Sequence, residues 1–312
     1  MSNVVQSTLT VILRVGFVLG NLGNGFIALV NCMDWVKRRK MSSVDQILTA
    51  LAISRLGVLW IVLLDCWVSV TFPENWISEK MLRLTYFIRH VSTHFSIWFA
   101  TSLSIYYFLK IANFSNSNFL YLKFRVKKVV SVTLLVSLVL LFFKIVLLST
   151  HFGFTIDTCK TNMSHSFNLT QVVQFSKLYL FTNTVFTSIP FLVSLITFLL
   201  LIISLWKHHK KMQQSGIGSR DASTMAHIKA LKMAIASLLL YTIFFVFLLL
   251  KIWSFKFLEQ NLLILFSLAS GISFASGHSC VLILGNSRLR RASLLLLWRL
   301  RCRCKGVRPL SP

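Results

Sequence analysis

Seven long apolar segments constrain this 312-residue chain more than any other feature. They cover approximately residues 8–33, 44–70, 82–110, 129–150, 178–205, 228–250 and 262–285. Each is long enough to cross a bilayer, which takes about 20 apolar residues. In lipid a segment must satisfy its own backbone polar groups, so helices are predicted rather than open strands. The sequence therefore predicts an all-α membrane protein, a bundle of seven transmembrane helices.

The basic residues predict how the bundle is oriented. The chain has 33 Lys and Arg against 8 Asp and Glu, a net charge of +25, which could indicate nucleic acid or a membrane surface. Most of the basic residues fall in the connections after segments one, three and five and in the C-terminal tail. Under the positive-inside rule, this side is cytoplasmic and the N-terminus is extracellular. The excess charge follows from topology and lipid contact, and no nucleic acid partner is expected.

The chain divides into the seven-helix domain, residues 1–285, and a basic cytoplasmic tail, residues 286–312. The first segment is expected to remain in the domain, because no small-residue cleavage site followed by a soluble domain is apparent. The tail from Arg288 to Arg303 encloses SLLLLW, which predicts an amphipathic helix on the membrane surface. The alternative is a disordered tail held by anionic lipid. Cys302 and Cys304 are either palmitoylated or free thiols.

The fourth connection carries two glycosylation sequons, at Asn162 and Asn168. Glycans attach on the lumenal side, and charge counting places this connection outside. Both asparagines are therefore predicted glycosylation sites.

Three charged or polar positions lie where lipid penalises them. Arg55 lies near mid-membrane in the second segment, where a charge costs at least ~2.5 kcal/mol, so it must face the bundle interior. Asn24 lies at similar depth in the first segment and is predicted to be its partner. The pair forms either a polar network that changes between states or a static clamp. Lys144, near an outer segment end, is expected to extend to the interface.

The outer half of the third segment carries a polar stripe. Arg89, His90, Thr93 and His94 share one helix face by their spacing. A stripe at this depth indicates a ligand pocket open to the outside, although structural histidines would give the same pattern. No arrangement typical of a catalytic or metal site appears, so no enzyme activity, cofactor or metal is expected. A transporter would predict inverted repeats with broken helices, and none is evident.

Several segment-end motifs carry a family resemblance. They are LAISR around Arg55, LLLIISLWKHHKKMQ at 199–213, AHIKALKM at 226–233 and HSCVLILGNSRLR at 278–290. Together they resemble the type 2 taste receptors, the bitter-taste family of G-protein-coupled receptors. Like that family, the chain lacks the Asp-Arg-Tyr and Asn-Pro-x-x-Tyr motifs of rhodopsin-like receptors. It also has no Cys at 78–95 to pair with Cys159; Cys66 is a conceivable substitute. Vomeronasal type 1 receptors are the nearest alternative.

The resemblance implies a plasma-membrane receptor for bitter small molecules. It implies coupling to gustducin or another inhibitory-class Gα with βγ, leading to phospholipase C and calcium release; a receptor oligomer is left open. The implied ligand positions are Arg89, His90, Thr93, Phe186, Phe244 and Leu268. The implied G-protein-facing positions are Tyr107, Lys110, His208, Met212, His227 and Lys229. Arg89 stands where several members have Trp, which predicts a cationic pocket wall that disfavours cationic alkaloids.

Overall fold

The computed structural model describes residues 2–71, 79–161, 169–214, 222–253 and 260–304. Regular structure in those ranges is α-helical and forms nine helices. They are α1 (Ser2–Arg38), α2 (Ser43–Thr71), α3 (Glu79–Ile111), α4 (Ser117–Phe124), α5 (Val126–Thr161), α6 (Leu169–Gln214), α7 (Ala222–Trp253), α8 (Gln260–Gly285) and α9 (Ser287–Cys304).

Seven of these helices correspond to the seven expected spans, which confirms the predicted fold class. In the described ranges, six contain a stretch long and apolar enough to cross a membrane. The exception is α3, whose outer half carries Arg89, His90 and His94 and is therefore less apolar. Its 33 residues are nevertheless long enough to span the hydrocarbon core.

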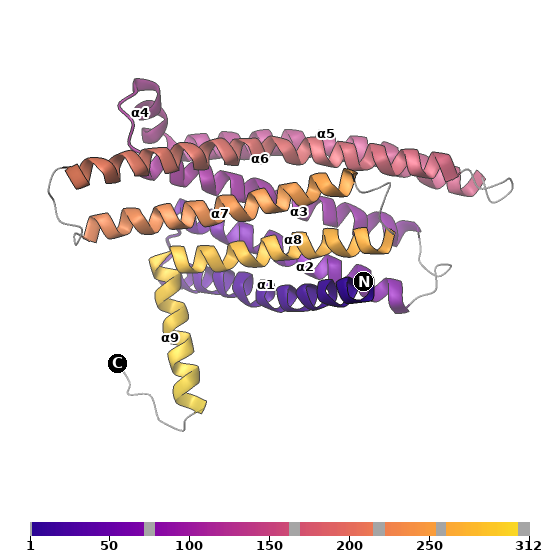
Figure 1. Ribbon diagram of the computed structural model, residues 1–312, viewed down its shortest axis with the longest axis horizontal. Helices are drawn as coiled ribbons and strands as arrows, with labels where there is room; N and C mark the ends of the chain where they lie inside the picture. Colours follow the sequence, from indigo (N-terminus) through magenta and orange to yellow (C-terminus); the bar gives the residue numbers. More distant parts are fainter. Residues whose placement is uncertain (1, 72–78, 162–168, 215–221, 254–259, 305–312) are drawn as a thin grey trace.

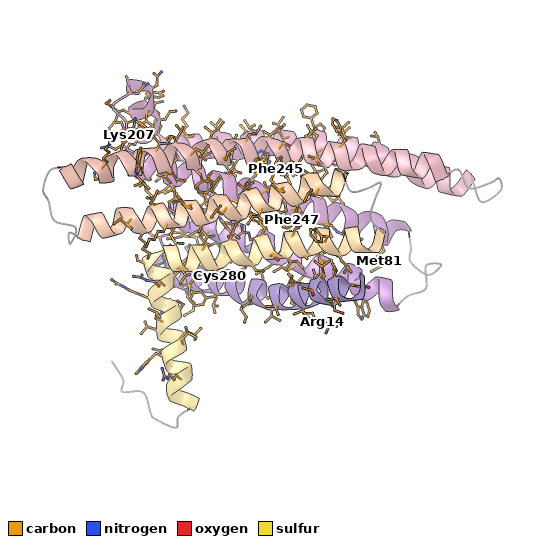
Figure 2. The ribbon with its side chains drawn as sticks, in the orientation of Figure 1. Arg14, Met81, Lys207, Phe245, Phe247 and Cys280 are labelled. Atoms are coloured by element: carbon orange, nitrogen blue, oxygen red, sulfur yellow. The ribbon has the colours of Figure 1, made fainter. Side chains whose placement is uncertain are left out.

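The long helices run side by side along the long axis of the molecule (Figure 1). α1 packs against α2 and α8, α3 packs against α2, α5 and α6, and α7 lies between α6 and α8. Side chains project from the outside of the bundle along its length (Figure 2). Large apolar residues are exposed there, among them Leu135, Phe142 and Leu192. An exposed apolar surface of this kind is what a lipid-facing belt requires.

Glycines bring α1 close to α8. A Cβ at Gly16 would lie 2.8 Å from Cγ2 of Ile272, and one at Gly20 would lie 2.8 Å from Oγ of Ser276. The Ser276 hydroxyl donates a hydrogen bond of 2.6 Å to the carbonyl of Gly16. Small residues four apart allow such close approach between membrane helices. The first and last spanning helices are thus joined along a tight seam.

Two helices lie outside the bundle. α4 follows α3 and is capped at its start by Asn116, whose side chain accepts a hydrogen bond from the backbone N–H of Asn118. This short helix was not predicted from the sequence. α9 turns away from the direction of the bundle (Figure 1), and Leu289, near its start, is fully buried at 0% exposure. A helix therefore occupies most of the segment expected to form the tail.

Candidate functional site

Arg55 lies on α2 and is completely buried, at 0% exposure. Its Nη2 lies 2.9 Å from Nδ1 of His278, and its Nη1 donates to Oγ of Ser279 at 3.4 Å. Both partners belong to α8, 223 and 224 residues further along the chain. A guanidinium only donates hydrogen bonds, so Nδ1 of His278 accepts and carries no proton.

The bonds continue from α8 to α1. The Ser279 hydroxyl donates to Oδ1 of Asn24 at 2.7 Å, and Nδ2 of Asn24 donates to the carbonyl of Gly20 at 2.8 Å. Arg55 and Asn24 thus belong to one network, with Ser279 bridging them. Three helices, α1, α2 and α8, are tied together at the depth where unpaired polar groups cost most. We call Asn24, Arg55, His278 and Ser279 the central polar network.

Phe274 connects this network to the aromatic side of the bundle. The guanidinium carbon of Arg55 lies 5.5 Å from the centroid of the Phe274 ring, a cation–π distance. Phe274 also stacks on Phe244 of α7 at 4.9 Å and on His278 at 5.8 Å. The position of this one ring is therefore coupled both to α7 and to the buried charge.

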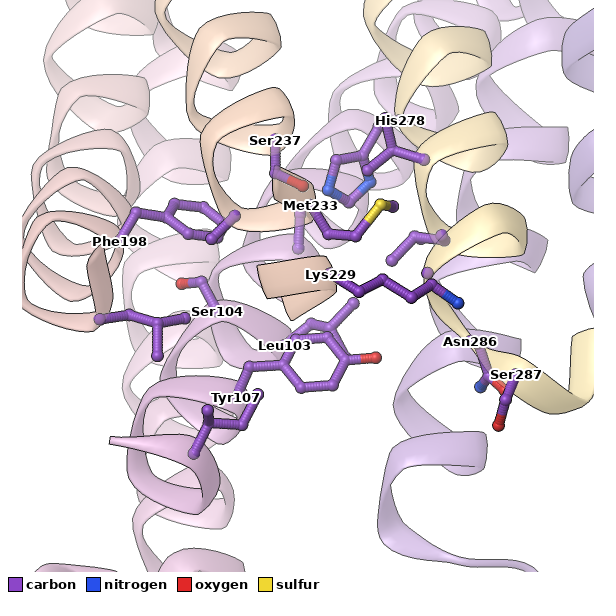
Figure 3. A pocket seen from close by; sticks show the side chains of 17 residues that line it. Leu103, Ser104, Tyr107, Phe198, Lys229, Met233, Ser237, His278, Asn286 and Ser287 are labelled. Carbon is purple, nitrogen blue, oxygen red and sulfur yellow. The ribbon is translucent and has the colours of Figure 1, made fainter. Parts of the chain in front are cut away.

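A cavity of about 310 Å³ opens below the network at the cytosolic end (Figure 3). Its lining includes Tyr107 of α3, Lys229 and Met233 of α7, and Asn286 between α8 and α9. His278 also lines this cavity and so connects it to Arg55. The cavity lies between α3, α6, α7 and α8 at this end of the bundle. We call it the cytosolic cavity.

The structure brings together two of the six residues expected to face a G protein, namely Tyr107 and Lys229. Lys110 is exposed on α3 and His208 is half-buried on α6, and neither lines the cytosolic cavity. The side chains of Met212 and His227 lie outside the described part of the structure.

The six expected ligand positions lie on four helices. Arg89, His90 and Thr93 occupy the outer half of α3, where His90 is buried at 7% exposure, and Phe186 is half-buried on α6. Phe244 lines a separate cavity between α1, α7 and α8. Leu268 packs against a buried cluster that contains Leu59, Val62 and Ile272. Asn162 and Asn168 lie outside the described residues.

Comparison with known proteins places the chain in a family. The family profile "Taste receptor protein (TAS2R)" matches residues 1–301. Taste receptor type 2 member 14 of Macaca mulatta is 52% identical over 309 residues, covering 99% of this chain and 97% of the relative. Taste receptor type 2 member 140 of Rattus norvegicus is 51% identical over 312 residues, covering all of both chains.

The chain belongs to the TAS2R family of bitter taste receptors. It is thus a G-protein-coupled receptor and a multi-pass protein of the plasma membrane, and it is not an enzyme. The family assignment predicted from the segment-end motifs is confirmed, and the vomeronasal and transporter alternatives are set aside.

Lys144 of the receptor differs from expectation. It was predicted to extend to the outer interface, but its side chain is buried at 3% exposure. It lies near His94, whose Nε2 is 2.9 Å from the carbonyl oxygen of Ser137 one helix away. Packing of α5 against α3 encloses this lysine, and the span sequence alone does not reveal that packing.

Arg288 is a structural residue that sequence reasoning missed. Its guanidinium lies 2.7 Å from Oδ1 of Asp45 and 3.0 Å from Oδ2 of Asp34, and it also donates to Oδ1 of Asn31. These contacts hold the start of α9 against α1 and α2. A signal was available, because the chain has only 8 acidic residues and two of them flank the first cytosolic connection.

Proposed function

We propose that the receptor detects bitter small molecules in the outer half of its bundle and activates gustducin or another inhibitory-class Gα with βγ. The observation that carries the proposal is the position of Tyr107 and Lys229 in one cytosolic cavity. Tyr107 lies on the same helix, α3, as Arg89, His90 and Thr93, and at 1.5 Å per residue it is about 21–27 Å from them. A shift of α3 or α7 caused by a ligand would therefore change the shape of the cavity.

The ligand side of the proposal rests on α3. Arg89 and His90 lie one turn outside His94, and the buried Lys144 lies near His94, so the outer half of the bundle is rich in basic groups. Such a wall repels cations and favours anionic or acceptor-rich bitter compounds. The other proposed ligand positions are Thr93, Phe186, Phe244 and Leu268. Phe244 stacks on Phe274, so a ligand that moves Phe244 would also move the ring next to the central polar network.

The cytosolic side follows a helix-in-groove mode. A helical segment of Gα would enter the cytosolic cavity, with Lys110, His208, Met212 and His227 at its margin. Agonist binding would shift an existing equilibrium between inactive and active conformations. Calcium release through phospholipase C would follow. α9, with its exposed run from Leu294 to Trp298, would lie on the anionic inner leaflet.

Calcium imaging tests the proposal. Cells that express the receptor with a gustducin-containing chimeric Gα are screened against a chemically diverse panel of bitter compounds. We expect a response that is lost without the Gα, and lost again in Lys229→Glu. Lys232→Glu serves as the matched control, because Lys232 is exposed on the same helix and does not line the cavity. Equal responses from the two variants would contradict the proposed cytosolic site.

A further inference from the structure

A second cavity, of about 230 Å³, lies between α1, α7 and α8 in the outer half of the bundle. It is separate from the cytosolic cavity, with which it shares no lining residue. Four phenylalanines and several aliphatic side chains dominate its wall. The lining residues on α7 and α8 are Leu240, Ile243, Phe244, Phe247, Phe266, Ala269, Ser270, Ser273 and Phe274. We call it the lateral cavity.

The lateral cavity is continuous with the lipid-facing surface. Ile12 of α1 is 40% exposed and Ile243 of α7 is 51% exposed, and both line the cavity and face outward. Ser273 of α8 is also exposed. Leu9 and Ala269, by contrast, are buried at 7% and 4%. The cavity thus runs from the lipid-facing surface inward, and an acyl chain of the surrounding bilayer can enter it.

The volume and the long axis of the lateral cavity indicate what kind of molecule can occupy it. A cavity of about 150 Å³ lined by aliphatic and aromatic side chains binds benzene, so 230 Å³ has room for roughly nine carbons by proportion. That is too small for a fused four-ring sterol nucleus. The lining extends about 10–12 Å along α7 and α8, from the helical rise between its first and last residues. The cavity is therefore elongated in the direction of the helices, which is also the direction of lipid chains.

We propose that the lateral cavity binds one acyl chain of a bilayer phospholipid. The chain packs between Ile12 and Ile243 at the mouth and reaches Phe274 at the inner wall. Apolar contact with four aromatic rings supplies the binding energy, and dispersion contacts add over the whole chain segment. Because Phe274 stacks on Phe244 and lies over Arg55, the bound chain also supports the ring that covers the buried charge.

Photolabelling tests this binding site. The receptor is reconstituted in phosphatidylcholine nanodiscs that contain a trace of phosphatidylcholine with a diazirine on one acyl chain. After illumination, labelled peptides are mapped by mass spectrometry. We expect saturable labelling concentrated at residues 240–247 and 266–274, competed by unlabelled lipid. Labelling spread evenly over the lipid-facing surface, including the exposed Val139 and Leu192, would overturn the proposal.

A matched pair of variants sharpens the test. Ser273→Phe fills the lateral cavity and should abolish the concentrated labelling. Cys280→Phe places the same ring on the same exposed side of α8, two turns away and outside the cavity. This variant should leave the concentrated labelling unchanged. If Ser273→Phe fails to fold, Ile243→Trp at the mouth replaces it. Unchanged labelling in a folded cavity-filling variant would show that the lipid only coats the surface.

Discussion

Arg288 and Asp45 form an ion pair with 2.7 Å between Nη2 and Oδ1, and this pair joins the start of α9 to the start of α2. The same guanidinium reaches Asp34 of α1, so one side chain links three helices at the cytosolic end. Asp45 also accepts a hydrogen bond of 2.7 Å from the Ser42 hydroxyl just before α2. The rim of the cytosolic cavity is therefore held by charge as well as by packing.

Arg288→Ala should lower the stability of the purified receptor. The side chain of Arg288 is 34% exposed and that of Asp45 is 14% exposed, so the loss lies between surface and buried ion pairs, about 1–2 kcal/mol in free energy of unfolding. The apparent melting temperature in detergent measures the effect. Arg291→Ala, at an exposed position of α9, is the control. An equal melting temperature for the two variants would contradict a structural role for the ion pair.

Gly20→Ala should destabilise the seam between α1 and α8. The added Cβ would lie 2.8 Å from Oγ of Ser276 and 2.9 Å from Cδ1 of Leu59, and overpacking of this kind costs about 1–3 kcal/mol. Gly25→Ala is the matched control on the same helix, because its Cβ would meet nothing within 4 Å. The measurements are the surface expression and the melting temperature of both variants, and we expect both to be lower for Gly20→Ala than for Gly25→Ala. The idea fails if Gly20→Ala is as stable as Gly25→Ala.

His278→Phe should impair folding although the ring still fits against Phe274. The substitution removes Nδ1, the acceptor that lies 2.9 Å from the Arg55 guanidinium, and leaves a buried charge short of a partner. Such a loss costs about 1–3 kcal/mol, or more for a charged group. His278→Asn, which can supply an acceptor oxygen, should recover part of the surface expression measured by flow cytometry. No difference between Phe and Asn at this position would show that the hydrogen bond is unimportant.

Arg89→Gln should change the ligand preference of the receptor. Removal of the positive charge should weaken responses to anionic agonists and strengthen those to cationic ones, because the Coulomb energy of the ligand changes sign with its charge. Dose–response curves for one anionic and one cationic agonist measure the shift. Arg14→Gln, at an exposed position on α1, is the control. A parallel shift for both agonists would argue against an electrostatic role.

The fold was predictable because lipid imposes one requirement on every span. A long apolar segment in a bilayer has to be a helix, and the distribution of Lys and Arg orients the set. It was harder to predict from the sequence which face of each helix points into the bundle. Lys144 looks like a residue at a span end, yet the rotation of α5 turns it into the bundle, to 3% exposure. The rotation is set by packing against α3, which a single sequence does not report.

Part of the central polar network could be predicted from the sequence, because lipid penalises a buried charge. The cost of a charge at mid-membrane identified Arg55 as an interior residue and indicated that it had a partner. The choice of His278 and Ser279 depends on which turn of α8 faces α2, at a separation of more than 200 residues. Asn24 was expected to be the partner of Arg55, whereas the structure connects the two through Ser279, which has no signal of its own in the sequence.

The hydrogen bonds from Arg55 to α8 also impose an order of events during biosynthesis. His278 is synthesised 223 residues after Arg55, which is about 10–45 s at ribosomal rates of roughly 5–20 residues per second. During that interval the guanidinium lacks the two acceptors that α8 supplies, and α1 lacks the surface that its glycines fit. The bonds between α2 and α8 and the seam between α1 and α8 can therefore form only after the last span has been inserted. A nascent chain that stops before α8 carries an unpaired charge and an open seam, two features by which a cell can distinguish an unfinished receptor from a complete one.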